Sequence, residues 1–122
     1  MTKRELKASS VDRLVDRFVE NSVAQDEALL YDDIRTANRL IDEMRGIEDE
    51  LHRREGDQRR ALVALYHHGN MQVRLNAAKA TLGLIPSAAR EALQAIRESK
   101  APQALDAGMC LWNLDRGVFK PT

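Results

Sequence analysis

A chain of 122 residues suits one domain, and 43% hydrophobic residues are enough to build a buried core. Lys plus Arg and Asp plus Glu number 19 each, so no overall charge attracts the chain to nucleic acid or to an anionic membrane. The amino terminus lacks the apolar run of a signal peptide, and no apolar stretch is long enough to span a bilayer. We therefore expect a cytoplasmic protein without membrane contact.

The first half of the chain carries two helical patterns. From Ser10 to Leu30 the apolar residues follow the i, i+3, i+4 spacing of one helical face. Asp32 or Asp33 can cap a second helix, in which apolar residues recur at near-heptad spacing as far as Gly56. Both patterns predict long amphipathic helices.

The second half predicts four shorter helices. Asp57 can cap a third helix that runs to about His68, and Asn70 can cap a fourth. Pro86 and Pro102 suit the first turns of a fifth and a sixth helix. Few stretches alternate as strands do, so we expect an all-α fold of about six antiparallel helices. One domain would cover residues 10–117, with a flexible amino-terminal tail at 1–9 and a carboxyl-terminal tail at 118–122.

A repeat appears when the sequence is shifted by 30 positions. Residues 73–84 then overlie residues 103–114, and seven pairs match in size and polarity. The pairs are Leu75 with Leu105, Asn76 with Asp106, Ala77 with Ala107, Ala78 with Gly108, Ala80 with Cys110, Leu82 with Trp112, and Leu84 with Leu114. A fixed period of this length is typical of a solenoid, in which each helix pair buries its apolar face against the next.

The segment from Asn70 to Gly83, with Val73-Arg74 and Ala77-Ala78, resembles the second helix of a HEAT repeat. The resemblance covers about residues 58–115 and implies a short α-α superhelix of the HEAT/ARM type. It also implies that Arg74 lies along its helix pair and bonds a loop carboxylate or carbonyl, with ligand contact as the alternative. In the second unit Gln103-Ala104 replaces the Val-Arg pair, which suits a terminal, capping pair.

The chain also resembles a small bacterial family catalogued as a domain of unknown function with an ARM/HEAT-like fold. The residues that carry this resemblance are Gln25-Asp26-Glu27-Ala28, Ala37-Asn38-Arg39, Val73-Arg74 and Trp112. It implies a fold and supplies no mechanism.

His67 and His68 are the candidate metal ligands, but neighbouring helical residues point about 100° apart and do not readily chelate one ion. We interpret them as the end of a helix and its loop. The chain has no Gly-x-Ser-x-Gly motif and no Gly-rich phosphate loop, and Cys110 has no histidine near it in sequence. We therefore expect no enzymatic activity, no cofactor and no metal. A catalytic triad assembled only in the fold is the alternative.

Two single residues have competing interpretations. Cys110 has no partner for an internal disulfide and lies in an apolar pattern, so we expect it in the core. Trp112 takes the place of Leu82 in the repeat, so we expect it to fill a core gap. A binding anchor is the alternative for Trp112.

Four arginines cluster around the turn at residues 52–60, namely Arg53, Arg54, Arg59 and Arg60. Together with Lys79 they support an alternative function as a nucleic-acid-binding HEAT-like module, since arginine suits phosphate. Acidic residues flank the arginines, however, and this favours a solvated turn. Nucleic acid is thus the disfavoured partner.

The hypothesis we favour is a non-catalytic scaffold that binds another protein or peptide on the concave face of stacked helix pairs. An inhibitor or immunity-type partner of another bacterial protein is the role we consider for it. Its polar positions left free by packing are Asn38, Arg39, Asp42, Asn76, Lys79, Asp106 and Asn113. They mix amides with both signs of charge, which suits a protein better than a phosphate backbone. We expect a monomer or a weak homodimer. A metal-dependent enzyme that uses the histidines is the hypothesis with least support.

Overall fold

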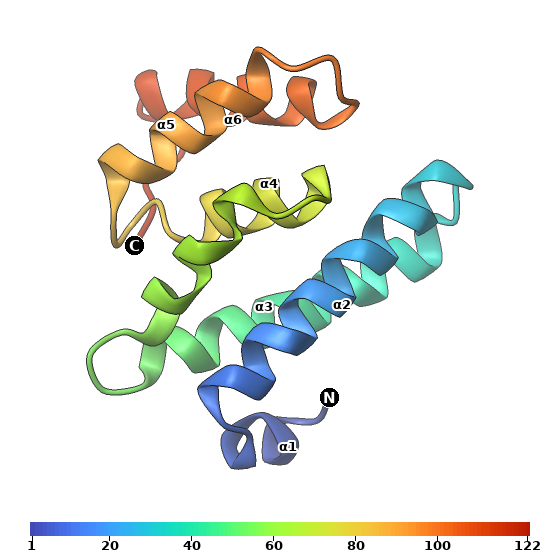
Figure 1. The fold of residues 1–122 in the computed structure, drawn as a ribbon, viewed down its shortest axis with the longest axis vertical. Helices are drawn as coiled ribbons and strands as arrows, with labels where there is room; N and C mark the ends of the chain where they lie inside the picture. The colour runs from blue at the N-terminus through green and yellow to red at the C-terminus, as the bar shows by residue number, and fades with distance from the viewer. The chain divides into compact units, whose positions relative to one another are not determined.

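The structure is a computed structural model that describes residues 1–122. It contains seven helices and no strand (Figure 1), which confirms the all-α class. The helices are α1 (Lys3–Ala8), α2 (Val11–Leu30), α3 (Ile34–Arg53), the 3-10 helix η1 (Gln58–His67), α4 (Met71–Ala80), α5 (Pro86–Arg97) and α6 (Gln103–Asp115). None of them is long and apolar enough to cross a membrane. The chain divides into two compact units, Met1–Ala61 and Leu62–Thr122.

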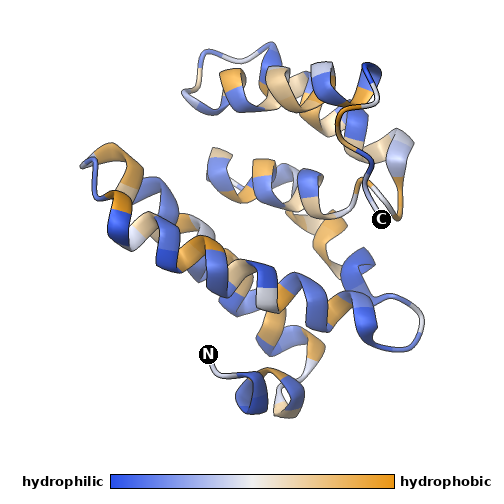
Figure 2. Ribbon diagram, turned by 180° about the vertical axis from the view of Figure 1, so that it is seen from behind, coloured by the Kyte–Doolittle hydropathy of each residue, from blue (hydrophilic) through white to orange (hydrophobic).

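The amino-terminal unit is built on α2 and α3, which pack side by side (Figure 1). The Ser10 hydroxyl caps α2 by accepting a hydrogen bond from the backbone N–H of Arg13. The Asp33 carboxylate caps α3 by accepting one from the backbone N–H of Thr36. Hydrophobic residues recur among hydrophilic ones along both helices (Figure 2), as expected for helices with one buried face. Their buried apolar side chains include Leu14, Phe18, Leu40, Met44, Ile47 and Leu51. The two predicted helices are confirmed.

Helix α1 lies within the segment expected to be the amino-terminal tail. Its Leu6 is buried, and a Cβ on Gly46 of α3 would lie only 3.2 Å from the Leu6 side chain, so the glycine permits this approach. Arg54 holds the carboxyl end of α1, because its Nη2 donates to the backbone carbonyls of Leu6 at 3.0 Å and Ser9 at 2.6 Å. Residues 3–8 are therefore packed against α3.

Between α2 and α3 lies a polar network centred on Glu43. Its carboxylate accepts hydrogen bonds from Arg17 at 2.8 Å, Asn21 at 2.9 Å and the amino group of Met1 at 2.7 Å. Burial by itself would raise the pKa of Glu43, but the hydrogen bonds from the amino group and Asn21, with the charge of Arg17, outweigh it and hold the pKa below its usual value. The fully buried Asn21 also donates to the carbonyl of Leu40 and accepts from Gln25, so its amide is satisfied.

The third predicted helix forms as the 3-10 helix η1. Both Gly56 and Asp57 have positive φ, at 78° and 49°, so the chain turns sharply after α3. Asp57 pairs with Arg59, whose Nη2 lies 2.7 Å from the carboxylate. Hydrogen bonds from Arg59 lower the pKa of Asp57 and keep this pair charged. The pair stabilises the start of η1.

The carboxyl-terminal unit packs α4, α5 and α6 against one another. The side chain of Asn70 accepts hydrogen bonds from the backbone N–H groups of Gln72 and Val73, and Pro86 begins α5, as predicted. Arg74 donates from Nε to the backbone carbonyl of His68, the role that its resemblance to a HEAT repeat implies. The core comprises Leu75, Ala78, Leu82, Ala89, Leu93, Ile96, Ala107, Cys110 and Leu111.

The two halves of the sequence repeat differ in burial. Leu75 and Leu82 are 1% and 2% exposed, whereas their counterparts Leu105 and Trp112 are 74% and 59% exposed. The expectation that Trp112 fills a core gap is therefore wrong. Helix α4 contacts both α5 and α6, but α6 ends the series and no further helix of this unit covers the outer side of Leu105 and Trp112.

Candidate functional site

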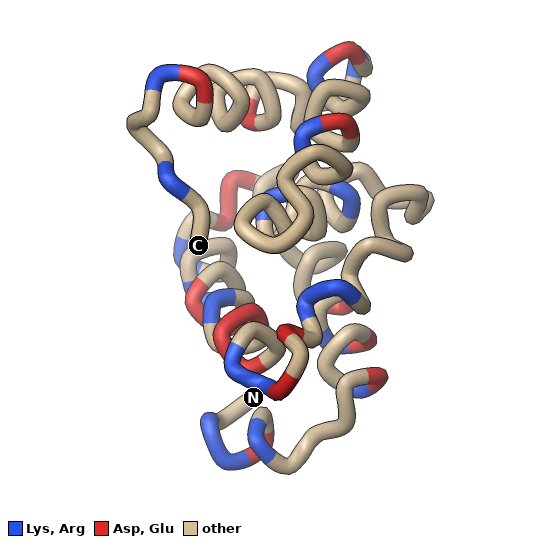
Figure 3. Tube along the Cα trace, turned by 90° about the vertical axis from the view of Figure 1, so that its left-hand side faces the viewer, with Lys and Arg blue, Asp and Glu red and all other residues tan.

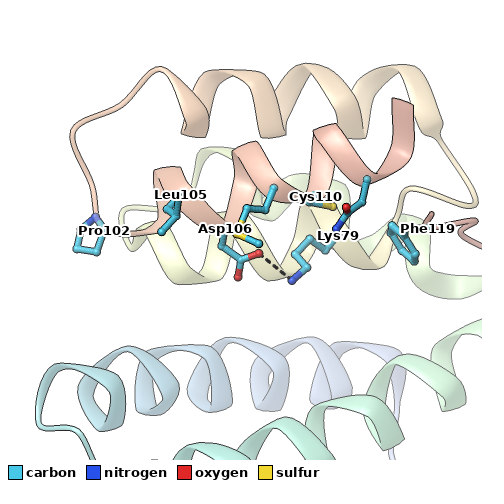
Figure 4. A pocket seen from close by; sticks show the side chains of 8 residues that line it. Lys79, Pro102, Leu105, Asp106, Cys110 and Phe119 are labelled. Atoms are coloured by element: carbon cyan, nitrogen blue, oxygen red, sulfur yellow. Dashed lines mark hydrogen bonds and ion pairs between the residues drawn. The ribbon is translucent and has the colours of Figure 1, made fainter. Parts of the chain in front are cut away.

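A hollow of about 600 Å³ opens between α4, α6 and the residues that follow α6 (Figure 4). We call it the α4–α6 groove. Its lining is Lys79, Pro102, Leu105, Asp106, Met109, Cys110, Asn113 and Phe119. All of these residues belong to the carboxyl-terminal unit, so the groove does not depend on the other unit.

The polar part of the groove is an ion pair between α4 and α6. Lys79 Nζ lies 3.2 Å from Asp106 Oδ1, and Figure 4 shows the two side chains pointing toward each other. Both side chains are about half exposed, so the pair adds little to folding stability. It is an accessible pair of opposite charges that a partner can engage.

The chain after α6 folds back onto the groove. The backbone N–H groups of Val118 and Phe119 donate to the carbonyl of Asn113 at 2.9 and 3.2 Å, which brings the Phe119 ring to the lining. Farther along, the backbone of Thr122 lies against Gly83, where a Cβ would come within 2.3 Å of the Thr122 carbonyl carbon. Gly83 is thus required by a close backbone approach.

An apolar ridge formed by Leu105, Met109 and Trp112 borders the groove along α6. These side chains are 74%, 56% and 59% exposed and follow the i, i+4, i+7 spacing of one helical stripe. A smaller hollow of about 420 Å³ on the other side of the ridge is also lined by all three residues. Arg116 stacks on the Trp112 ring at 4.2 Å from its centroid, a cation–π contact that orients the indole.

The groove offers no reactive nucleophile. Burial raises the pKa of the Cys110 thiol, so at neutral pH it is protonated and behaves as a small apolar side chain. The thiol is free and buried, in agreement with the core position expected from the sequence. No group of three or more His, Cys, Asp or Glu side chains lies close enough to hold a metal ion.

Three of the seven predicted site residues meet in the groove, namely Lys79, Asp106 and Asn113. Asn76 lies one turn before Lys79 on α4, outside the lining, and accepts a hydrogen bond from Gln72 at 3.0 Å. The other three, Asn38, Arg39 and Asp42, are exposed on α3 in the amino-terminal unit, where Asp42 pairs with Arg45 at 3.4 Å.

Sequence reasoning missed the apolar members of the groove. Leu105 was matched with Leu75 in the repeat but was not predicted to be a site residue, and neither were Met109 and Phe119. A signal was present, because α6 carries apolar residues on every side and yet is the last helix. A helix that is apolar all round needs cover on all sides.

Most arginines of the turn at residues 52–60 form ion pairs with neighbouring carboxylates. Arg54 pairs with Glu50 at 2.9 Å and Arg59 with Asp57 at 2.7 Å, and the exposed Arg53 lies 3.7 Å from Glu50. Acidic and basic residues are interspersed along the helices (Figure 3). The turn therefore presents little unpaired positive charge to a phosphate backbone.

Residues 12–115 match a protein family described as a domain of unknown function (DUF2019). The crystal structure of the protein RPA1889 from Rhodopseudomonas palustris CGA009 is similar, with a TM-score of 0.93 and 52% sequence identity. The similarity covers 96% of this chain and 98% of that one. No curated protein matches the chain.

Proposed function

The chain belongs to the DUF2019 family, and from this premise and the α4–α6 groove we propose that it is a non-catalytic module that binds another protein or a peptide. The observation that carries the proposal is the exposed apolar ridge of Leu105, Met109 and Trp112 on the last helix. Single exposed apolar residues are common on protein surfaces, whereas contiguous ones mark interaction sites more often. An apolar ridge between two hollows there fits a binding surface.

The composition of the groove also favours a protein partner. Aromatic residues and methionine are enriched where proteins meet, and here Met109 and Phe119 lie beside the mixed-charge pair of Lys79 and Asp106. A partner segment with an apolar face and one acidic or basic residue at its edge would contact both the apolar residues and the ion pair of the groove. We place the partner among bacterial proteins, with inhibition or immunity as the role, and the complex in the cytoplasm.

We further propose that the helix pairs are HEAT/ARM-like and that a solenoid forms the scaffold of the groove. Two features within the carboxyl-terminal unit support this. Arg74 bonds to the loop carbonyl of His68, and the small residues Ala77, Ala78 and Ala107 are fully buried. Small side chains allow neighbouring helices to approach closely. By itself the chain would be a monomer or a weak homodimer.

Site-specific photo-crosslinking in cells tests the proposed surface. A photoreactive amino acid in place of Leu105 should give a discrete adduct with one protein, whereas the same probe at Gln94, exposed on α5, should not. Adding Met109→Glu should reduce the Leu105 adduct roughly tenfold, because a charge enters the apolar ridge. Adducts of equal yield from both positions, or none from Leu105, would show that this surface has no specific protein partner.

A further inference from the structure

A separate hollow of about 460 Å³ lies in the carboxyl-terminal unit where the end of η1 meets α4 and α5. It shares no residue with the α4–α6 groove. Met71, Ala92 and Ile96 form an apolar wall, and the side chains of His67, Arg74 and Glu91 also line the hollow. Its volume lies within the range of roughly 300 to 1,000 Å³ that is usual for small-molecule sites.

Arg74 is the half-buried cation of this hollow. Its Nε donates to the backbone carbonyl of His68, which fixes the plane of the guanidinium. The two terminal amino groups make no hydrogen bond or ion pair within the protein. Two parallel donors held in a fixed plane match the two oxygens of a carboxylate.

The other polar groups of the hollow make no bond to the terminal amino groups of Arg74. The Tyr66 hydroxyl bonds to Thr81, and the Ser99 hydroxyl donates to the Ile96 carbonyl at 2.5 Å. Glu91 is exposed, so water screens its negative charge, whereas the half-buried Arg74 is screened less. The interior of the hollow therefore favours an anion over a cation.

We propose that this hollow binds a carboxylate attached to an apolar chain, with the carboxylate on Arg74 and the chain along Met71, Ala92 and Ile96. A phosphate group carries more charge and would call for further cations, and Arg74 is the only arginine or lysine in the lining. The carboxylate can come from a free carboxylic acid or from the carboxyl end of a peptide with an apolar last residue. The site is independent of the proposed protein-binding groove.

Isothermal titration with octanoate tests the proposal on the full chain. Octanoate should bind, while octanol and octylamine, which carry the same chain without the carboxylate, should bind at least tenfold more weakly. A short peptide that ends in leucine, with a free or an amidated carboxyl end, distinguishes the two sources. Tighter binding of the free peptide than of octanoate assigns the site to peptides, and the reverse assigns it to free acids.

Three variants place the binding in this hollow. Arg74→Gln should weaken octanoate binding roughly tenfold or more, the usual effect of losing hydrogen bonds to a charged group. Ala92→Phe should abolish binding by filling the hollow without touching the guanidinium, and Glu91→Gln should strengthen it about twofold by removing repulsion. The exposed Arg35→Gln in the other unit is the matched control and should change nothing.

Thermal melting separates loss of binding from loss of folding. If Arg74→Gln unfolds the protein, Ala92→Phe and Glu91→Gln still decide the question. Octanol binding as tightly as octanoate would overturn the proposal, and so would octanoate affinity unchanged in the folded Arg74→Gln and Ala92→Phe variants. Failure of both octanoate and the free-carboxylate peptide to bind would overturn it as well.

Discussion

Glu43 is the residue on which the polar interior of the amino-terminal unit depends. It is only 17% exposed, yet it stays ionised because Arg17, Asn21 and the Met1 amino group all donate to it. Such a carboxylate would be costly in an apolar environment without these donors. The fully buried Asn21 and Ser22 are likewise satisfied, by the Leu40 and Phe18 carbonyls. Polar residues between α2 and α3 thus fix the pairing of these helices as well as adding to their stability.

Lowering the pH should destabilise the protein through Glu43. Its pKa is lowered by folding, so its contribution to the free energy of unfolding is fully present above the ordinary value of 4.5 and is lost as the pH falls below it. Glu43→Gln should reduce the free energy of unfolding at pH 7 by about 1 to 3 kcal/mol. Urea unfolding at a series of pH values should show this difference shrinking as the pH approaches 3.

The exposed Glu27→Gln on α2 serves as the control and should leave the free energy of unfolding within about 0.5 kcal/mol of the unchanged protein at every pH. A Glu43→Gln variant whose deficit is as large at pH 3 as at pH 7 would contradict the assignment of Glu43 as an ionised hydrogen-bond acceptor.

At the scale of elements, α1 is held by one side chain more than by its own sequence. A helix of six residues is too short to be stable alone, and only Leu6 on it is buried. Arg54 reaches from the end of α3 to the carbonyls of Leu6 and Ser9, while Glu50 fixes its guanidinium at 2.9 Å. These carbonyls lie at the carboxyl end of α1, where a cation is favourable.

Arg54→Ala should release α1 from α3. The amides of residues 6–9 should then exchange with deuterium about tenfold faster or more, while those in the middle of α2 remain protected. Arg53→Ala is the matched control, because Arg53 is 63% exposed and lies 3.7 Å from the same Glu50. Equal exchange rates in the two variants would mean that Arg54 does not hold α1.

Helix α4 packs through small side chains. Ala77 and Ala78 are both fully buried, and Ala78 belongs to the core shared with α5 and α6. A larger side chain at either position has no space unless the helices move apart. The contacts of α4 therefore depend on residue size more than on hydrophobicity.

Ala78→Leu should lower the free energy of unfolding by about 1 to 3 kcal/mol through overpacking. His67→Ala should be nearly silent in the same denaturation experiment, because His67 is exposed at the end of η1. If the two effects are reversed, the assignment of α4 as a close-packed helix is wrong.

For the whole molecule, the balance of charge decides the kind of partner more than any single residue does. The 19 basic and 19 acidic residues cancel, and the sequence pI is about 6.8. Ion pairs such as Arg54 with Glu50 and Arg59 with Asp57 use up local positive charge. A surface of this kind gives no long-range attraction to DNA or RNA.

We therefore expect no retardation of duplex DNA in a gel-shift assay at about 0.15 M salt, where charges farther apart than about 8 Å are screened. Weak binding at low salt should disappear as the salt concentration rises. Retardation that persists at 0.15 M and is lost in an Arg60→Glu variant would instead support the nucleic-acid-binding alternative.

Most of the helices could be predicted from the sequence, because the signals that start them are local, whereas α1 was not predicted. Side-chain caps at Ser10, Asp33 and Asn70 and a proline at the start of α5 act within one helical turn. Asn70 and the proline lie where they were predicted, Asp33 is one of the two caps considered for α3, and Ser10 stands at the predicted start of α2. The polar members of the α4–α6 groove were also predictable in part, since Lys79 and Asp106 occupy positions that packing leaves free.

Which apolar residues are buried could not be predicted from the sequence, because burial depends on the packing of the helices. Leu75 and Leu105 are equivalent in the sequence repeat, but α4 is covered by α5 and α6, whereas α6 is the last helix of its unit and leaves Leu105, Met109 and Trp112 exposed. The same holds for Arg54, whose acceptors on α1 lie more than 40 positions away in the sequence. Burial and long-range hydrogen bonds depend on neighbours in space, and a periodic pattern does not specify whether such a neighbour is present.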